Sequence, residues 1–106
     1  MAQFDDRRDA FENRFAHDEA LRFKATARRN KLLGQWAAAQ LGKTGAEAEE
    51  YAKAVVLADF KEAGDGDVIA KVRDDLGAAG HSTTDEAIRA KLDGFMTQAV
   101  AEMQTA

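Results

Sequence analysis

The chain has no cysteine and no proline among its 106 residues. The absence of thiols excludes disulfides, thiol catalysis and thiolate metal sites. The absence of proline leaves helices uninterrupted. The hydrophobic residues make up 45% of the chain, and they are supplied largely by alanine with few valines or isoleucines, which favours helices over strands. The composition therefore predicts an all-α protein.

Long apolar runs are also missing. No stretch of 18 apolar residues exists, and the first residues lack the basic and apolar regions of a signal peptide. We therefore expect a soluble, cytoplasmic protein without direct membrane insertion. A chain of 106 residues forms one small domain, which is too small for a core together with an elaborate buried active site.

Residues 4 to 36 have helical spacing throughout, but they divide into two amphipathic units. The apolar face of the first unit is formed by Phe4, Phe11 and Phe15. The second unit has a stripe rotated by about 70° from the first, formed by Leu21, Ala25, Leu32 and Trp36. Because the phase changes at residues 17 to 19, the first unit cannot easily share the buried face of the second. It either folds back on its own domain or stays free as a ligand for a groove in another protein.

Energetics separate these two alternatives only in part. Burying three phenylalanines contributes on the order of 5 to 9 kcal/mol. Ordering roughly 14 residues at about 1 to 2 kcal/mol each costs more. Without a partner or a deep groove, we expect residues 1–17 to be a mobile segment.

Capping residues divide the remainder, residues 18–106, into helices. Asp18 is placed to cap the first helix, and Gly42 is suited to end it. Capping-box patterns with a glutamate three residues later open the second helix at Thr44 and the fourth at Thr83, and Asp67 is placed to cap the third. Short loops favour antiparallel neighbours. The predicted fold is a small antiparallel four-helix bundle preceded by the mobile segment, with helices at about 18–41, 46–63, 67–76 and 84–103.

Three short motifs partly resemble sites that bind a metal, bind a phosphate or transfer a proton. Asp65-Gly66-Asp67 begins like a calcium loop but lacks the later carboxylates, and Gly42-Lys43-Thr44 lacks the glycine and the strand of a phosphate loop. His17 lies beside two carboxylates without a nucleophile near it in sequence. Ordinary turns and a helix cap explain all three, so the sequence predicts no metal site, no required cofactor and no enzyme.

Charge is unevenly distributed. Residues 1 to 42 carry eight Lys and Arg against six Asp and Glu, whereas the rest of the chain is acidic. The basic patch comprises Arg22, Lys24, Arg28, Arg29 and Lys31, with Trp36 one to two turns further on. Three interpretations remain open: a solvated helix face, a site for an adenine nucleotide or another anion with Trp36 stacking on the base, and a surface that docks on an acidic protein. Nucleic acid is not expected as a partner, because the whole chain is acidic and has no second basic element.

The run FDDRRDAFENRFAHDEALRFKATARRNKLLGQWAA closely resembles the zeta subunit of alphaproteobacterial F-type ATP synthases, a small inhibitor of ATP hydrolysis. The resemblance extends over the whole chain. It includes the acidic second helix with Tyr51-Ala52 and Val55-Val56, the turn at residues 65–67, the helix at residues 71–76 and the last helix after Thr84-Asp85. Its specificity lies mainly in residues 4 to 36.

The resemblance implies a four-helix bundle whose N-terminal segment inserts at a catalytic interface between the alpha and beta subunits, against the central rotor. By position, the anchoring residues would be Phe4, Phe11 and Phe15. The residues that match charge would be Asp5, Asp6, Arg7, Arg8, Glu12 and Arg14. We expect a monomer when the chain is free, and a location at the inner membrane only through the ATP synthase. An adenine-nucleotide sensor is the alternative function.

Overall fold

The computed structural model describes residues 18–59 and 64–105. These residues form four α-helices: α2 Glu19–Gln40, α3 Gly45–Ala58, α4 Gly66–Ala78 and α5 Asp85–Thr105. The described residues contain no strand, and the prediction of an all-α, four-helix protein is confirmed. The segment predicted to be mobile, residues 1–17, lies outside the described residues.

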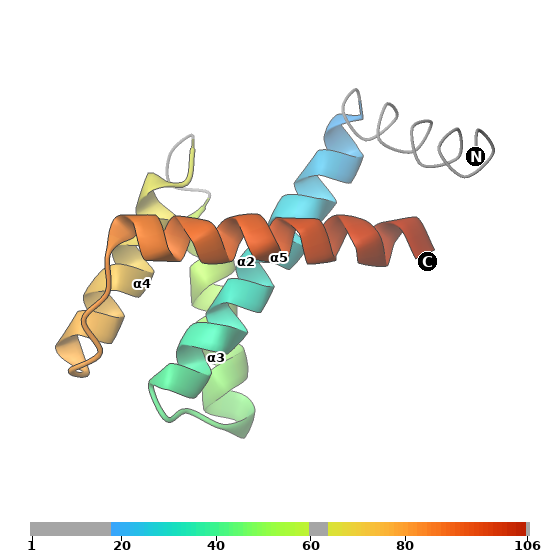
Figure 1. The fold of residues 1–106 in the computed structure, drawn as a ribbon. Coiled ribbons are helices and arrows are strands. Elements are labelled where there is room, and N and C mark those ends of the chain that lie inside the picture. The colour runs from blue at the N-terminus through green and yellow to red at the C-terminus, as the bar shows by residue number, and fades with distance from the viewer. Residues whose placement is uncertain (1–17, 60–63, 106) are drawn as a thin grey trace.

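Helix α2 is the centre of the arrangement, because the two most extensive contacts between helices are those that it makes with α3 and α5 (Figure 1). Helix α3 runs antiparallel to it: Gly34 lies against Ala52, and Asn30 shares a small cavity with Val56 further along α3. Helix α5 lies across α2 in Figure 1. Arg28 of α2 pairs with Glu102, near the C-terminal end of α5. Helix α4 completes the bundle against α3 and α5.

The apolar core lies between the four helices. The apolar residues of α4 at helical spacing are buried, as are Ile88 and Leu92 of α5. Helix α2 contributes to the main core cluster only from Leu33 onward. The cluster comprises Leu33, Ala37, Ala38, Tyr51, Val55, Ala58, Val68, Ile69, Val72, Leu76, Ile88 and Leu92. Of the apolar stripe predicted on α2, Ala25 and Leu32 are buried, and Leu21 and Trp36 are partly buried.

Two glycines end helices in the left-handed conformation. Gly42 has φ 76°, and the N–H of Lys43 donates to the carbonyl of Ala38 at 2.9 Å. Gly80 has φ 87°, and the N–H of His81 donates to the carbonyl of Leu76 at 2.8 Å. These bonds satisfy carbonyls that the last turn of each helix leaves free. The predicted end of α2 at Gly42 is confirmed.

The N-terminal caps agree with the sequence only at α2. Asp18 Oδ1 accepts from the N–H of Leu21 at 3.1 Å, as predicted. The capping box predicted at Thr44 is wrong, because that side chain makes no capping bond. The box predicted at Thr83 is displaced by one residue, since Thr84 Oγ1 accepts from the N–H of Ala87 at 3.1 Å.

The start of α4 also differs from the expectation. The capping position belongs to Asp65, and Asp67 lies in the first turn. The Asp65 carboxylate makes no capping bond, because it binds Arg29 of α2 instead. Helix α3 ends at Ala58, where the N–H of Asp59 donates to the carbonyl of Val56 at 3.2 Å. The predicted continuation to 63 falls partly on residues 60–63, which lie outside the described residues.

Candidate functional site

The predicted inhibitory residues cannot be placed, because they all lie within 1–17, outside the described residues. They are Phe4, Asp5, Asp6, Arg7, Arg8, Phe11, Glu12, Arg14 and Phe15. The structure does describe the point where this segment joins the bundle. Asp18 has an extended backbone, with φ −106° and ψ 105°, and its side chain caps α2. Helix α2 therefore begins here, where the sequence predicts the change of phase.

The structure separates the predicted basic patch into different environments. Arg22, Lys24 and Lys31 are exposed. Arg28 and Arg29 instead form ion pairs with two other helices. Two of the five basic residues proposed from the sequence for a nucleotide or anion are therefore paired with carboxylates of the same chain.

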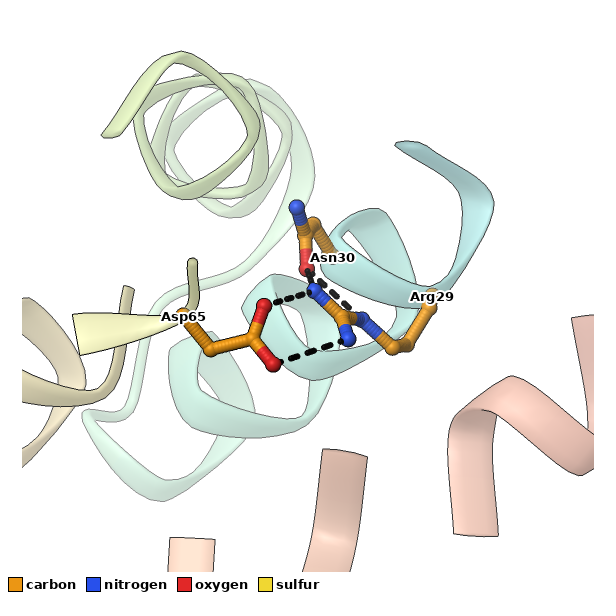
Figure 2. Close-up of polar contacts among 3 residues, drawn as sticks. All are labelled: Arg29, Asn30 and Asp65. Atoms are coloured by element: carbon orange, nitrogen blue, oxygen red, sulfur yellow. Dashed lines mark hydrogen bonds and ion pairs between the residues drawn. The ribbon is translucent and has the colours of Figure 1, made fainter. Parts of the chain in front are cut away.

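Arg29 lies at the centre of a buried polar cluster (Figure 2). Its guanidinium donates to both carboxylate oxygens of Asp65, at 2.8 Å from Nη2 and 3.3 Å from Nη1. It also donates to Asn30 Oδ1, at 2.8 Å from Nη2 and 3.0 Å from Nε. Bidentate contacts of this kind are directional as well as strong. The cluster joins the middle of α2 to the first residue before α4.

Most of this cluster is shielded from solvent, so its charged and polar groups depend on one another for hydrogen bonds. The Arg29 side chain is only 8% exposed and that of Asp65 31%. Asn30 is almost completely buried, and its Nδ2 has no acceptor among the residues that the structure describes. A buried ion pair is weak evidence for stability. Separating its partners, however, leaves an uncompensated buried charge, so the pair favours the helix arrangement in which the partners meet. No local pattern links Asp65 with Arg29, because the two residues are 36 positions apart in the chain.

Arg28 makes the second contact between helices. Its Nε donates to Glu102 Oε1 of α5 at 2.8 Å, and Gln98 Nε2 donates to the other carboxylate oxygen at 3.1 Å. The hydrogen bond from Arg28, followed by that from Gln98, lowers the pKa of Glu102. Both side chains of the ion pair are about 40% exposed, so solvent screens the interaction.

Trp36 lies two turns along α2 from Arg29. It is partly buried against the core, and Lys91 of α5 lies over its ring at 5.1 Å from the centroid. A pocket of about 280 Å³ opens beside it, lined by Trp36, Gln40, Leu76, His81, Ser82 and Thr83. An aromatic wall, a nearby ammonium group and polar side chains are compatible with a planar, negatively charged ligand. Nothing in the sequence had pointed to Lys91 as a neighbour of this ring.

A third polar cluster joins α3 to α4. Tyr51 donates to Asp75 Oδ2 at 2.8 Å, and Lys71 Nζ lies 3.0 Å from the same oxygen. Lys71 also lies over the Tyr51 ring, at 5.1 Å from the centroid. Burial and the hydrogen bond to Asp75 raise the pKa of Tyr51. A phenol held neutral in this way stabilises the packing of the two helices and offers no base or nucleophile.

The described residues show no catalytic arrangement. Among residues 18–59 and 64–105, no group of three or more His, Asp or Glu side chains is placed to hold a metal ion. None of the described helices is both long and apolar enough to cross a membrane. The described residues form a helical protein with ion pairs that join its helices.

The comparisons with known proteins identify the family. The sequence profile of the family described as "ATPase inhibitor subunit zeta" matches residues 1–102. The chain therefore belongs to the ATPase inhibitor subunit zeta family. Its function is thus regulatory rather than enzymatic, and it associates with an ATP synthase.

The fold also agrees with a solved structure. A protein solved by solution NMR is 48% identical in sequence, with a TM-score of 0.68. The match covers 80% of this chain and 96% of the other. Among curated proteins, none matches the chain significantly.

Proposed function

We propose that the chain inhibits ATP hydrolysis by inserting its N-terminal segment at a catalytic interface of the F-type ATP synthase head. In this proposal the segment contacts the alpha and beta subunits and the central rotor. Phe4, Phe11 and Phe15 provide the apolar anchors, and the charged residues between them match the surface of the partner. The free chain is a monomer and reaches the inner membrane only through the ATP synthase.

The observation that carries the proposal is the boundary at Asp18. The family profile includes the residues before this boundary, and α2 begins there with an extended, capped residue. In the sequence, the apolar residues at positions 4–15 are out of phase with those of α2, so one continuous helix could not bury both sets on a single face. An amphipathic segment with three phenylalanines is suited to a hydrophobic groove of another protein.

The mechanism needs no chemistry by this chain. The interfaces of a rotary ATPase open and close during turnover. A helix that binds better to one of these states shifts the population toward it and stops the cycle. Ordering the segment consumes part of the contact energy, so the loss of a few contacts weakens inhibition steeply.

The test is an ATP hydrolysis assay with the cognate soluble ATPase head. The intact chain should inhibit, and the chain lacking residues 1–14 should not. Replacement of Phe4, Phe11 and Phe15 by alanine should also abolish inhibition. The matched control replaces Gln3 and Asn13, polar residues of the same segment, and should inhibit like the intact chain. Equal inhibition by the truncated chain would refute the proposal.

The pocket beside Trp36 favours a second candidate function, an adenine-nucleotide sensor. In this alternative the base stacks against Trp36, and Lys91 provides the charge that the predicted basic patch does not. Trp36 is the only tryptophan, so its fluorescence reports binding directly during titration with ATP or ADP. Lys91→Ala should weaken the response, whereas Lys53→Ala, an exposed lysine of α3 outside the pocket lining, should not. An unchanged signal at millimolar nucleotide would reject this alternative.

A further inference from the structure

The two halves of α2 are held in different ways. The main apolar core reaches α2 only at Leu33 and beyond. The residues buried before Leu33 include two polar side chains: the set is Ala25, Arg29, Asn30 and Leu32. The half of α2 that leads to Asp18 therefore depends on contacts other than the main core.

Two adjacent arginines supply such contacts. Arg29 holds Asp65, at the start of α4, and Arg28 holds Glu102, near the end of α5. Figure 1 shows that the N-terminal end of α2 and the C-terminal end of α5 lie on the same side of the molecule, away from α4. Through these two ion pairs, one turn of α2 is bound both to α5 and to the start of α4. We call Arg28, Arg29, Asp65 and Glu102 the arginine bracket.

Asp65 makes the contact between helices instead of a capping bond in its own helix. Asp65 occupies the capping position of α4, where its carboxylate would normally accept from a free N–H of the first turn. It makes no such bond, and both of its oxygens bind Arg29. Asn30 holds the same guanidinium from α2 itself, so the direction of the Arg29 side chain is fixed from two sides.

We propose that the arginine bracket is a positioning device for the inhibitory segment. By fixing the N-terminal half of α2, it fixes Asp18, the residue to which residues 1–17 are joined in the chain. This inference rests on the proposed function. It assigns Arg28 and Arg29 to orientation of the segment rather than to a ligand, and it makes them positioning residues for inhibition.

The test combines a distance measurement with the inhibition assay. Because the chain has no cysteine, spin labels can be placed specifically at Ala20→Cys in α2 and Glu86→Cys in α5, both of which are exposed. The bracket is removed by Arg28→Met with Arg29→Met, together with Asp65→Asn so that no buried carboxylate loses its partner. The control is Arg73→Met, which removes another arginine that joins two helices, through Asp85 at 2.9 Å.

With all variants folded by circular dichroism, we expect a broader label distance distribution in the bracket variant and an unchanged one in the control. If only about one molecule in ten then has the competent orientation, inhibition weakens by about tenfold. Should the triple variant fail to fold, the charge exchange Arg28→Glu with Glu102→Arg serves instead. Arg28→Glu alone should broaden the distribution and weaken inhibition, and the exchange should restore both.

An unchanged distance distribution, or a broadened one with full inhibition, would overturn the inference while leaving the proposed function intact. Inhibition that survives deletion of residues 1–14 would instead overturn the proposed function and, with it, the role of the bracket in inhibition.

Discussion

Helices α2 and α3 approach each other closely at Gly34, and this contact predicts different effects for two substitutions of the same kind. A Cβ at Gly34 would lie 2.6 Å from the Cα of Ala52 and 3.1 Å from its Cβ. Carbon atoms pack best at about 3.5 to 4.0 Å, so Gly34→Ala must push the two helices apart by about 1 Å. Gly94, exposed in α5, has nothing within 4 Å of the corresponding position.

The magnitude follows from two opposing effects. Replacing glycine by alanine inside a helix gains about 1 kcal/mol at either position. Gly94→Ala should therefore stabilise the protein by up to that amount. Overpacking costs about 1 to 3 kcal/mol, so Gly34→Ala should range from neutral to about 2 kcal/mol destabilising. The difference between the variants, about 1 to 3 kcal/mol, isolates the close approach because the helical gain is common to both.

Urea denaturation monitored by circular dichroism measures this difference, and the single tryptophan gives an independent signal. In thermal unfolding, each kcal/mol corresponds to a Tm shift of about 4 to 8 °C for a domain near this size. Equal stability of Gly34→Ala and Gly94→Ala would show that α3 does not approach α2 as closely as described. The reasoning about this helix contact would then be refuted.

Two further predictions concern a cap and a titration. Thr84→Ala removes the bond to the N–H of Ala87 and should cost about 0.5 to 2 kcal/mol in urea denaturation. Thr44→Ala, which removes no capping bond, should cost measurably less, and equal losses would contradict the assignment. Burial and the bond to Asp75 raise the pKa of Tyr51, so its contribution to stability is complete below the ordinary value of about 10 and falls as pH rises through the folded value. Tyr51→Phe should lessen this alkaline loss in unfolding experiments, and an identical pH profile would count against it.

The sequence predicts the elements of the bundle because local signals determine them. Helical spacing of apolar residues identifies the buried faces, and Asp18 and Gly42 mark the two ends of α2 correctly. The capping boxes predicted at Thr44 and Thr83 are wrong because a threonine followed three residues later by a glutamate does not by itself bring the hydroxyl to a free N–H. The backbone path decides this: the Thr44 side chain makes no capping bond, and at α5 the neighbouring Thr84 makes the bond instead of Thr83. Gly34 carried a weak signal, since a glycine inside a helix often permits close packing.

The contacts of the basic patch could not be predicted in the same way. Arg28 and Arg29 looked like solvated or ligand-binding cations because their partners, Glu102 and Asp65, are 74 and 36 residues away. Only the packing of α5 and α4 against α2 brings these carboxylates within reach. Asp65 had looked like part of a turn, and nothing local showed that its carboxylate leaves its own helix to bind an arginine.

The central claim is that residues before Asp18, rather than the bundle, contact the catalytic interface. The most direct measurement is photo-cross-linking of the inhibited complex, with a photoreactive amino acid in place of Phe11 in one sample and of Glu49, exposed on α3, in another. We expect adducts with the alpha or beta subunit from position 11 and few or none from position 49. Adducts from position 49 without adducts from position 11 would show that the bundle makes the inhibitory contact and would contradict the account.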